Sequence, residues 1–278
     1  MAKKAQLREL TADLKAAVVI GQQEAVSVAL DGLRQLPDIA GNHPIGEAFL
    51  EQAILPLGHI LSGGRIPAGR LVDYLRDPLT GIRAVASAAL GLRFCSQGDV
   101  QEGDLRRAGS DTREEVRVAL AKALIEGTPF SPEQVLLLGS AWARPHKGGA
   151  SWPVVELRLC TTALAFLTAF AQSQPEALLV VCLLLHRDGE LQVRAGVADL
   201  LLALAESGHS RAVLERLSGW AQEQQPNEWL ICRALSGSWA SRELEMAEEI
   251  LKSLEKQVGT SSQVSNARKA LERHAREQ

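Results

Sequence analysis

An arginine that follows an apolar residue recurs six times along the chain, and this repeat constrains the fold more than any other feature. The six dipeptides are Ile82-Arg83, Val116-Arg117, Leu157-Arg158, Val193-Arg194, Cys232-Arg233 and Ala267-Arg268. Successive arginines are 34, 41, 36, 39 and 35 residues apart, and the longest interval contains an insertion at residues 144–150. A period of roughly 20 to 50 residues is typical of proteins built from stacked repeats. The sequence therefore predicts a repeat array.

Each repeat is predicted to be a pair of helices joined by a short turn. Six residues before the arginines lie Asp77, Asp111, Trp152, Asp188, Asn227 and Ser262, and all but the tryptophan are residue types that cap helix N-termini. We expect them to cap the second helix of each pair, with Ser151 in place of Trp152. A shorter amphipathic segment precedes each cap, and a single pair could not bury its apolar face without stacked neighbours.

Composition favours helices over sheets. Hydrophobic residues make up 46% of the chain and aromatic residues only 4%, with alanine and leucine in excess. We expect an all-α superhelix, an α-solenoid of about six to seven helix pairs, forming a single domain over residues 1–278. Residues 66–277 would hold the recognisable repeats. Residues 1–63 would form N-terminal capping helices at 5–19, 22–36 and 45–61, with a loop at 37–44.

The pattern Asp-x4-Ile/Val-Arg, present at 77–83, 111–117 and 188–194, resembles that of the HEAT-repeat family. Six residues along a helix turn through about 600°, so an Asp and an Arg at this spacing do not share one helix face. The resemblance implies pairing between neighbouring repeats, in a structural ladder made of Asp77, Arg83, Asp111, Arg117, Asp188 and Arg194. The tetratricopeptide repeat has a similar period, but its aromatic signature is absent.

Most catalytic signatures are missing from the sequence. There is no phosphate-binding loop, no His-Glu-x-x-His and no Gly-x-Ser-x-Gly, and the six histidines are scattered. The four cysteines form no Cys-x-x-Cys pair and are expected to be buried in a reducing cytoplasm. The N-terminus has no signal-peptide core, and no apolar run is long enough to span a membrane. We therefore expect a cytoplasmic protein without a metal or cofactor, and not an enzyme.

Tryptophan marks the candidate binding residues, because all five tryptophans lie in the second half. Trp142 and Trp152 flank the insertion, whose Arg144, His146 and Lys147 would suit an acidic partner or a phosphate. The set of candidate binding residues is completed by Trp229, Arg233 and Trp239. We expect the second helices to line a concave face that holds a protein partner. The oligomeric state is left open.

A second resemblance is to the bacterial alkylpurine DNA glycosylases, which are also built from HEAT-like repeats. It rests on Trp152-Pro-Val-Val-Glu156 and on the tryptophan-containing segment 227–239. The resemblance implies Glu156 as the catalytic carboxylate, with Trp152 and either Trp229 or Trp239 cradling a cationic base. The net charge of -3 lacks the basic excess expected of a DNA-binding clamp. A non-enzymatic scaffold for a protein partner is thus the first hypothesis, and a DNA-binding repair protein the alternative. A chromophore lyase or chaperone is a weaker alternative that rests on fold analogy.

Overall fold

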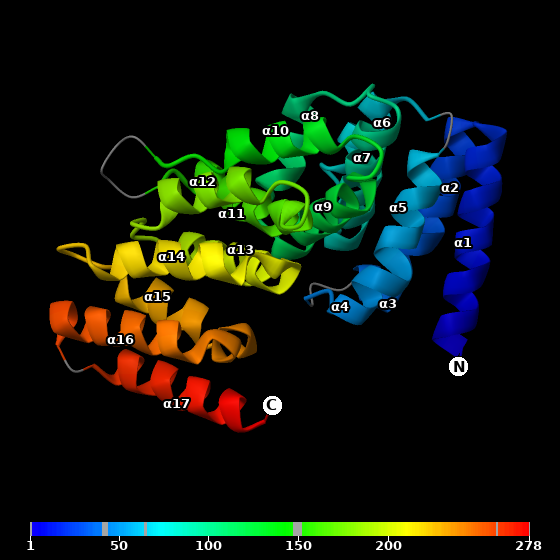
Figure 1. Cartoon of the computed structure of the whole chain (residues 1–278). Helices are drawn as coiled ribbons and strands as arrows, with labels where there is room; N and C mark the ends of the chain where they lie inside the picture. Colours follow the sequence, from blue (N-terminus) through cyan, green and yellow to red (C-terminus); the bar gives the residue numbers. More distant parts are fainter. Residues whose placement is uncertain (1, 41–43, 64–65, 147–151, 260, 278) are drawn as a thin grey trace. The chain divides into compact units, whose positions relative to one another are not determined.

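The computed structural model describes residues 2–40, 44–63, 66–146, 152–259 and 261–277, and every regular element in these ranges is a helix (Figure 1). The expectation of an all-α protein is confirmed. The chain divides into two compact units, Met1–Leu138 and Gly139–Gln278. None of the helices described is both long and apolar enough to cross a membrane.

Unit 1 contains ten α-helices, the last of which ends just beyond it. They are α1 (Ala2–Ile20), α2 (Gln23–Arg34), α3 (Pro37–Ala40), α4 (Glu47–Phe49), α5 (Leu55–Ser62), α6 (Ala68–Tyr74), α7 (Thr80–Ser96), α8 (Glu102–Gly109), α9 (Glu114–Gly127) and α10 (Pro132–Trp142). Two details differ from the expectation. The loop predicted at 37–44 begins with the short helix α3, since Pro37 suits a first helical position, where no amide donor is needed. The helix predicted at 45–61 widens into a π-helical turn, Leu50–Ile54, just before Pro56, which has no amide to donate.

Unit 2 is also made of helices joined by short turns. Its elements are α11 (Val154–Leu167), a 3-10 turn (Thr168–Phe170), α12 (Pro175–Leu185), α13 (Leu191–Leu204), a π turn (Ala205–His209), α14 (Ser210–Ala221), α15 (Glu228–Leu235), a 3-10 turn (Ser238–Glu243), α16 (Leu244–Val258) and α17 (Ser262–Arg276). Each of the six repeated arginines lies near the start or in the body of the second helix of its pair, which is α7, α9, α11, α13, α15 or α17.

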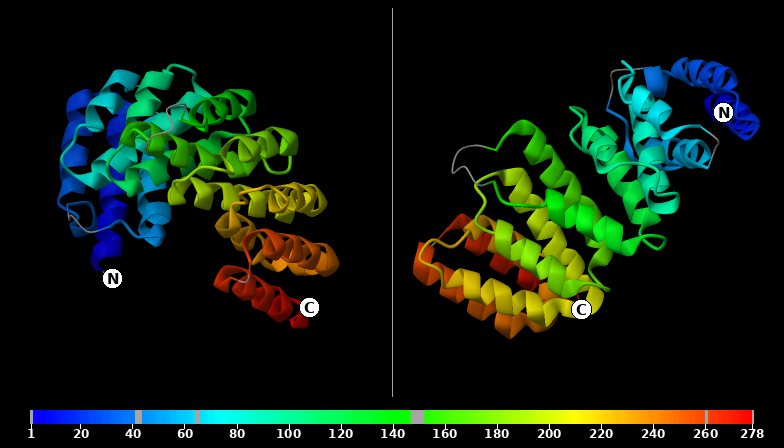
Figure 2. Two further views of the ribbon diagram at one scale, coloured as in Figure 1. Left: turned by 90° about the vertical axis from the view of Figure 1, so that its left-hand side faces the viewer. Right: turned by 90° about the horizontal axis from the view of Figure 1, so that it is seen from above.

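The second helices pack against one another within each unit. In unit 1, α7 lies between α5 and α9, and in unit 2, α13 lies between α11 and α15, which in turn contacts α17 (Figure 2). Glycine permits two of these close approaches. A Cβ on Gly127 would lie 2.4 Å from the sulfur of Cys95, and one on Gly196 would lie 2.7 Å from Leu164. The helices are therefore held close enough for their small side chains to exclude water from between them.

The capping prediction is only partly right. Asn227 caps α15 by accepting a hydrogen bond from the amide of Leu230 at 3.2 Å. Ser261, and not Ser262, caps α17. The three aspartates do not cap their helices, because each lies three residues before the first helical residue: Asp77 before α7, Asp111 before α9 and Asp188 before α13. Ser151 lies outside the described residues, and α11 begins directly after Pro153.

Candidate functional site

The three aspartates share one geometry, in which each carboxylate joins two helix pairs. One oxygen accepts the amide of the residue two positions further on, at 2.9 Å for Asp77, 2.8 Å for Asp111 and 2.9 Å for Asp188. The other oxygen accepts a side chain from an earlier part of the same unit. Because this arrangement fixes a turn and ties it to a neighbour, we call it a rung.

The donors of the three rungs differ from one another. Arg83 donates to Asp111 through Nε at 2.9 Å and Nη2 at 3.3 Å, which is the pairing between repeats implied by the ladder. Asp77 is bound by Arg34 of α2, in the segment where no repeat signature was recognised. Asp188 accepts from the indole Nε1 of Trp152 at 2.9 Å, so a tryptophan occupies a place that an arginine holds in unit 1.

The arginines also bind the turn that precedes their own helix. Arg83 donates to the carbonyl of Asp77 at 3.0 Å, and Arg117 donates to the carbonyl of Asp111 at 2.9 Å. Arg194 donates to the carbonyl of Gly189 at 3.3 Å, as Arg83 also does to the carbonyl of Pro78 at 3.3 Å. For Arg83 and Arg117 this backbone bond sets the distance between the turn and the arginine, while the aspartate side chain is used in the rung.

Arg194 departs from the ladder, and its assignment as a ladder residue is corrected here. No carboxylate in the described part of the chain lies within ion-pair distance of its guanidinium, and its buried Nε has no hydrogen-bond acceptor. The corresponding position of the next repeat is Asn227, whose side chain is occupied with the amide of Leu230 and the carbonyl of His186. An asparagine carries no charge to attract the arginine across the interface.

A surface pocket of about 750 Å³ opens beside this arginine. We call it the Arg194 pocket; its lining includes Arg187, Asp188, Arg194, residues 223–229 and Gln263. The guanidinium carbon of Arg194 lies 5.6 Å from the centre of the Trp229 ring, a cation–π distance. The structure thus brings together three of the residues singled out in the sequence, Asp188, Arg194 and Trp229.

A partly buried polar cluster supports the wall of the Arg194 pocket. The His186 ring stacks on Trp220 with centroids 4.5 Å apart and planes 8° apart. Glu223 accepts from His186 at 3.1 Å and from Arg187 at 3.0 Å. Burial works to raise the pKa of Glu223, but these two donors outweigh it and hold the pKa below its usual value. Glu223 is therefore a satisfied anion, and not a free carboxylate in the pocket.

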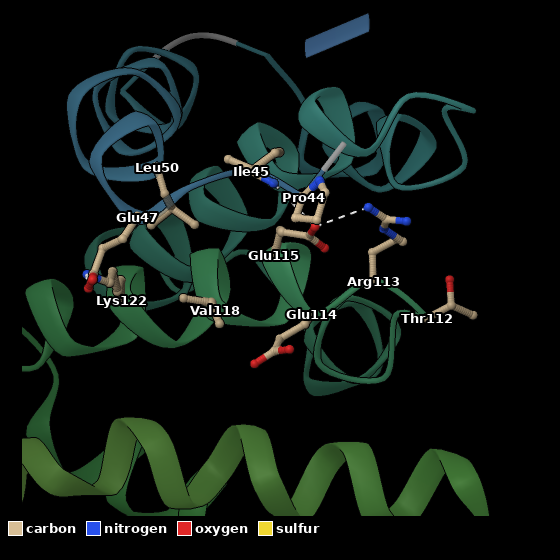
Figure 3. Close-up of a pocket in the computed structure, with 10 residues that line it drawn as sticks. All are labelled: Pro44, Ile45, Glu47, Leu50, Thr112, Arg113, Glu114, Glu115, Val118 and Lys122. Carbon is tan, nitrogen blue, oxygen red and sulfur yellow. Dashed lines mark hydrogen bonds and ion pairs between the residues drawn. The ribbon is translucent and has the colours of Figure 1, made fainter. Parts of the chain in front are cut away.

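A second pocket, of about 520 Å³, lies in unit 1 along the exposed face of α9 (Figure 3). We call it the α9 pocket; it is lined by Pro44, Ile45, Glu47 and Leu50 on one side and by Thr112, Arg113, Glu114, Glu115, Val118 and Lys122 on the other. Glu114, Val118 and Lys122 are spaced four residues apart and so share one face of the helix. The pocket is therefore bounded by α9, which is the second helix of its pair, and by a segment about 70 residues earlier in the chain.

Charged groups brace the α9 pocket. Glu115 accepts the backbone amide of Ile45 at 3.3 Å and Arg113 at 3.1 Å (Figure 3). Burial works to raise the pKa of Glu115, but these hydrogen bonds and its own backbone amide lower it overall. At the other end, Lys122 binds Glu51 at 2.6 Å and Glu47 at 3.2 Å, which raises the lysine pKa. The apolar side chains between these ion pairs are thus held in fixed positions.

Two of the predicted binding tryptophans are part of the core, which corrects their assignment to a binding face. Trp142 is 5% exposed and packs edge-to-face on Phe166, with ring centroids 6.2 Å apart. Trp239 is 2% exposed. A large aromatic ring within an apolar helical stripe buries more area in the core than any surface position would allow. Neither can contact a ligand, and Trp239 cannot form part of a base cradle.

The remaining predicted residues lie apart or outside the description. Arg144 and Arg233 are exposed, and Trp152 and Glu156 are half-buried at the start of α11. The His146 ring lies 5.9 Å from that of Trp152, while Lys147 falls outside the described residues. Sequence reasoning missed the α9 pocket altogether. The four-residue spacing along α9 was visible in the sequence, but its opposite wall depends on tertiary contacts.

Comparison with protein-family models finds no match, and comparison with curated proteins finds none. Within the described ranges, no three histidine, cysteine, aspartate or glutamate side chains gather as a metal site. The site must therefore be interpreted from its own geometry.

Proposed function

We propose that this protein is a non-enzymatic, HEAT-like α-solenoid scaffold that holds a segment of a protein partner on the exposed faces of its second helices. Six pairs support the proposal: α6–α7, α8–α9, α10–α11, α12–α13, α14–α15 and α16–α17. The recurrence of the rung at Asp77, Asp111 and Asp188 supports the assignment to HEAT-like repeats. Rigid repeats suit binding, because a fixed surface lowers the entropy lost when a partner docks.

The α9 pocket is the observation that carries the proposal. Its apolar side chains, Ile45, Leu50 and Val118, are flanked by charged groups that are already paired. Glu114 is exposed at the rim and adds a negative charge. An apolar side chain would fill the pocket and a neighbouring basic side chain would meet Glu114, so the partner segment should carry both.

A pair of photo-crosslinking variants tests the proposal. A photoreactive amino acid at Glu114 should capture a discrete partner in cell extract, whereas the same group at Arg76, an exposed residue outside the pocket, should not. The captured protein, once identified and purified, should bind the full chain. The Val118→Lys substitution should weaken that binding at least tenfold, because it places a charge among the apolar side chains. The matched Val28→Lys substitution, at a 70% exposed valine on α2, should leave it unchanged. Equal capture at both positions, or equal affinity of both lysine variants, would overturn the proposal.

No observation favours the other two functions. The base cradle suggested by the glycosylase resemblance loses Trp239 to the core, and the indole N–H of Trp152 is engaged with Asp188. The chromophore-binding alternative is supported only by its generic repeat architecture.

A further inference from the structure

Arg194 occupies the position in its repeat that Arg83 occupies in another, but it lacks the acceptor that Arg83 has. Both donate to the turn that precedes their own helix, Arg83 to Asp77 and Arg194 to Gly189. In addition, Arg83 donates two hydrogen bonds to the carboxylate of Asp111. For Arg194, the corresponding position of the next repeat is the neutral Asn227. The rung of Arg194 is therefore vacant.

The vacancy is open to a ligand. Arg194 and Asn227 both line the Arg194 pocket, together with the half-buried Trp229, whose ring holds the guanidinium by a cation–π contact. The Nε of Arg194 is shielded from water and has no hydrogen-bond acceptor, which is an unfavourable state for a charged donor. A carboxylate that entered the pocket could pair with the guanidinium group of Arg194, which lines it.

The acidic residues of the pocket are already engaged. Asp188 accepts from Trp152 and from the amide of Glu190. Glu223 accepts from His186 and Arg187. Glu228 accepts from the hydroxyl of Ser261. These carboxylates leave Arg194 unpaired, but they would repel a ligand that carries several negative charges. The pocket thus fits one carboxylate with neutral neighbours.

We propose that the Arg194 pocket binds a single aspartate or glutamate side chain of a protein partner, whose carboxylate completes the vacant rung as Asp111 does for Arg83. The proposal rests on the proposed function in one respect, namely that the ligand belongs to a protein. It involves other residues, in the other unit, so it can fail while the α9 pocket still binds, and the reverse also holds.

The test is an NMR titration of the full chain that follows the Nε–H signal of Arg194 and the indole signal of Trp229. The probe is the peptide acetyl-Gly-Glu-Gly-amide, with acetyl-Gly-Gln-Gly-amide and inorganic phosphate as comparisons. The glutamate peptide should shift both signals in a saturable way, and the glutamine peptide should not. Absence of a saturable shift, or equal shifts from both peptides, would overturn the proposal. So would tighter binding of phosphate, since that would mark a general anion site.

Two variants localise the effect. Asn227→Asp supplies the missing carboxylate from within the chain, so it should weaken peptide binding at least tenfold and raise the melting temperature. Aspartate keeps the capping oxygen for Leu230 but loses the bond to the carbonyl of His186. The Arg194→Met variant leaves the hydrogen bonds of Asn227 unchanged. It should weaken peptide binding at least tenfold. Its melting temperature should change little, because no carboxylate loses its partner. Peptide binding by either variant at wild-type affinity would refute the vacant rung.

Discussion

The rung between Arg83 and Asp111 should contribute measurably to the stability of unit 1. The side chains of Arg83 and Asp111 are only 13% and 12% exposed, and they are joined by two hydrogen bonds. Removing one partner of a fully buried pair costs about 3–5 kcal/mol. When Asp111 is replaced, Arg83 keeps its hydrogen bond to the carbonyl of Asp77. When Arg83 is replaced, Asp111 keeps its hydrogen bond from the amide of Arg113, so each charged group retains a hydrogen-bond partner. We therefore expect a coupling energy of about 2 kcal/mol between Arg83→Met and Asp111→Asn in a double-mutant cycle.

The assay can separate the two units, because all five tryptophans belong to unit 2. Urea unfolding followed by circular dichroism reports the helices of both units, and tryptophan fluorescence reports unit 2. The matched control is the exposed pair Arg211 and Glu215, 86% and 61% exposed with the atoms 3.4 Å apart. Its coupling should not exceed about 0.5 kcal/mol. The reasoning is refuted if the Arg83–Asp111 coupling is as small as that of the control.

Two further outcomes follow from groups whose pKa the fold shifts. Asp99 binds the buried Arg93, and this hydrogen bond outweighs burial and lowers the pKa of Asp99 below its usual 3.8. The ion pair therefore stabilises the fold above pH 3.8, and this stabilisation is lost as the pH falls through the lower pKa of the folded state. In urea titrations, the Asp99→Asn variant should be less stable than wild type at about pH 6. At about pH 2.5 the stabilities of the two proteins should approach each other. Equal losses at both pH values would contradict this assignment. Burial also raises the pKa of the thiols of Cys95, Cys160, Cys182 and Cys232 to about 12. None should react with a disulfide reagent at about pH 8 until the chain unfolds, and a thiol that reacts in the native state would show that its helix packing is looser than described.

The helix pairs could be predicted from the sequence because their signals are local. Apolar periodicity and a fixed spacing of arginines place α7, α9, α11, α13, α15 and α17 without knowledge of tertiary contacts. The rungs were predictable only where both partners followed the pattern, as with Arg83 and Asp111. Trp152 as a donor to Asp188 has no sequence signature. Arg34 lies outside the recognised repeats, although it serves Asp77 in the same way.

The candidate sites were less predictable, because exposure depends on packing. A tryptophan gives the same signal in the core as at a binding face, so Trp142 and Trp239 could not be told from Trp229. The α9 pocket needs Ile45 beside Glu115, two residues 70 positions apart that only the fold brings together. The vacant rung, in contrast, was already visible in the sequence as Asn227 in an aspartate position, once the geometry of the other rungs was known.

The most direct test of the central claim is hydrogen exchange of the full chain, measured with and without the partner identified by crosslinking at Glu114. A partner held in the α9 pocket should slow exchange of backbone amides in residues 44–50 and 112–122, since it covers both walls of the pocket. Unchanged exchange in these two segments while the partner is bound would contradict the account.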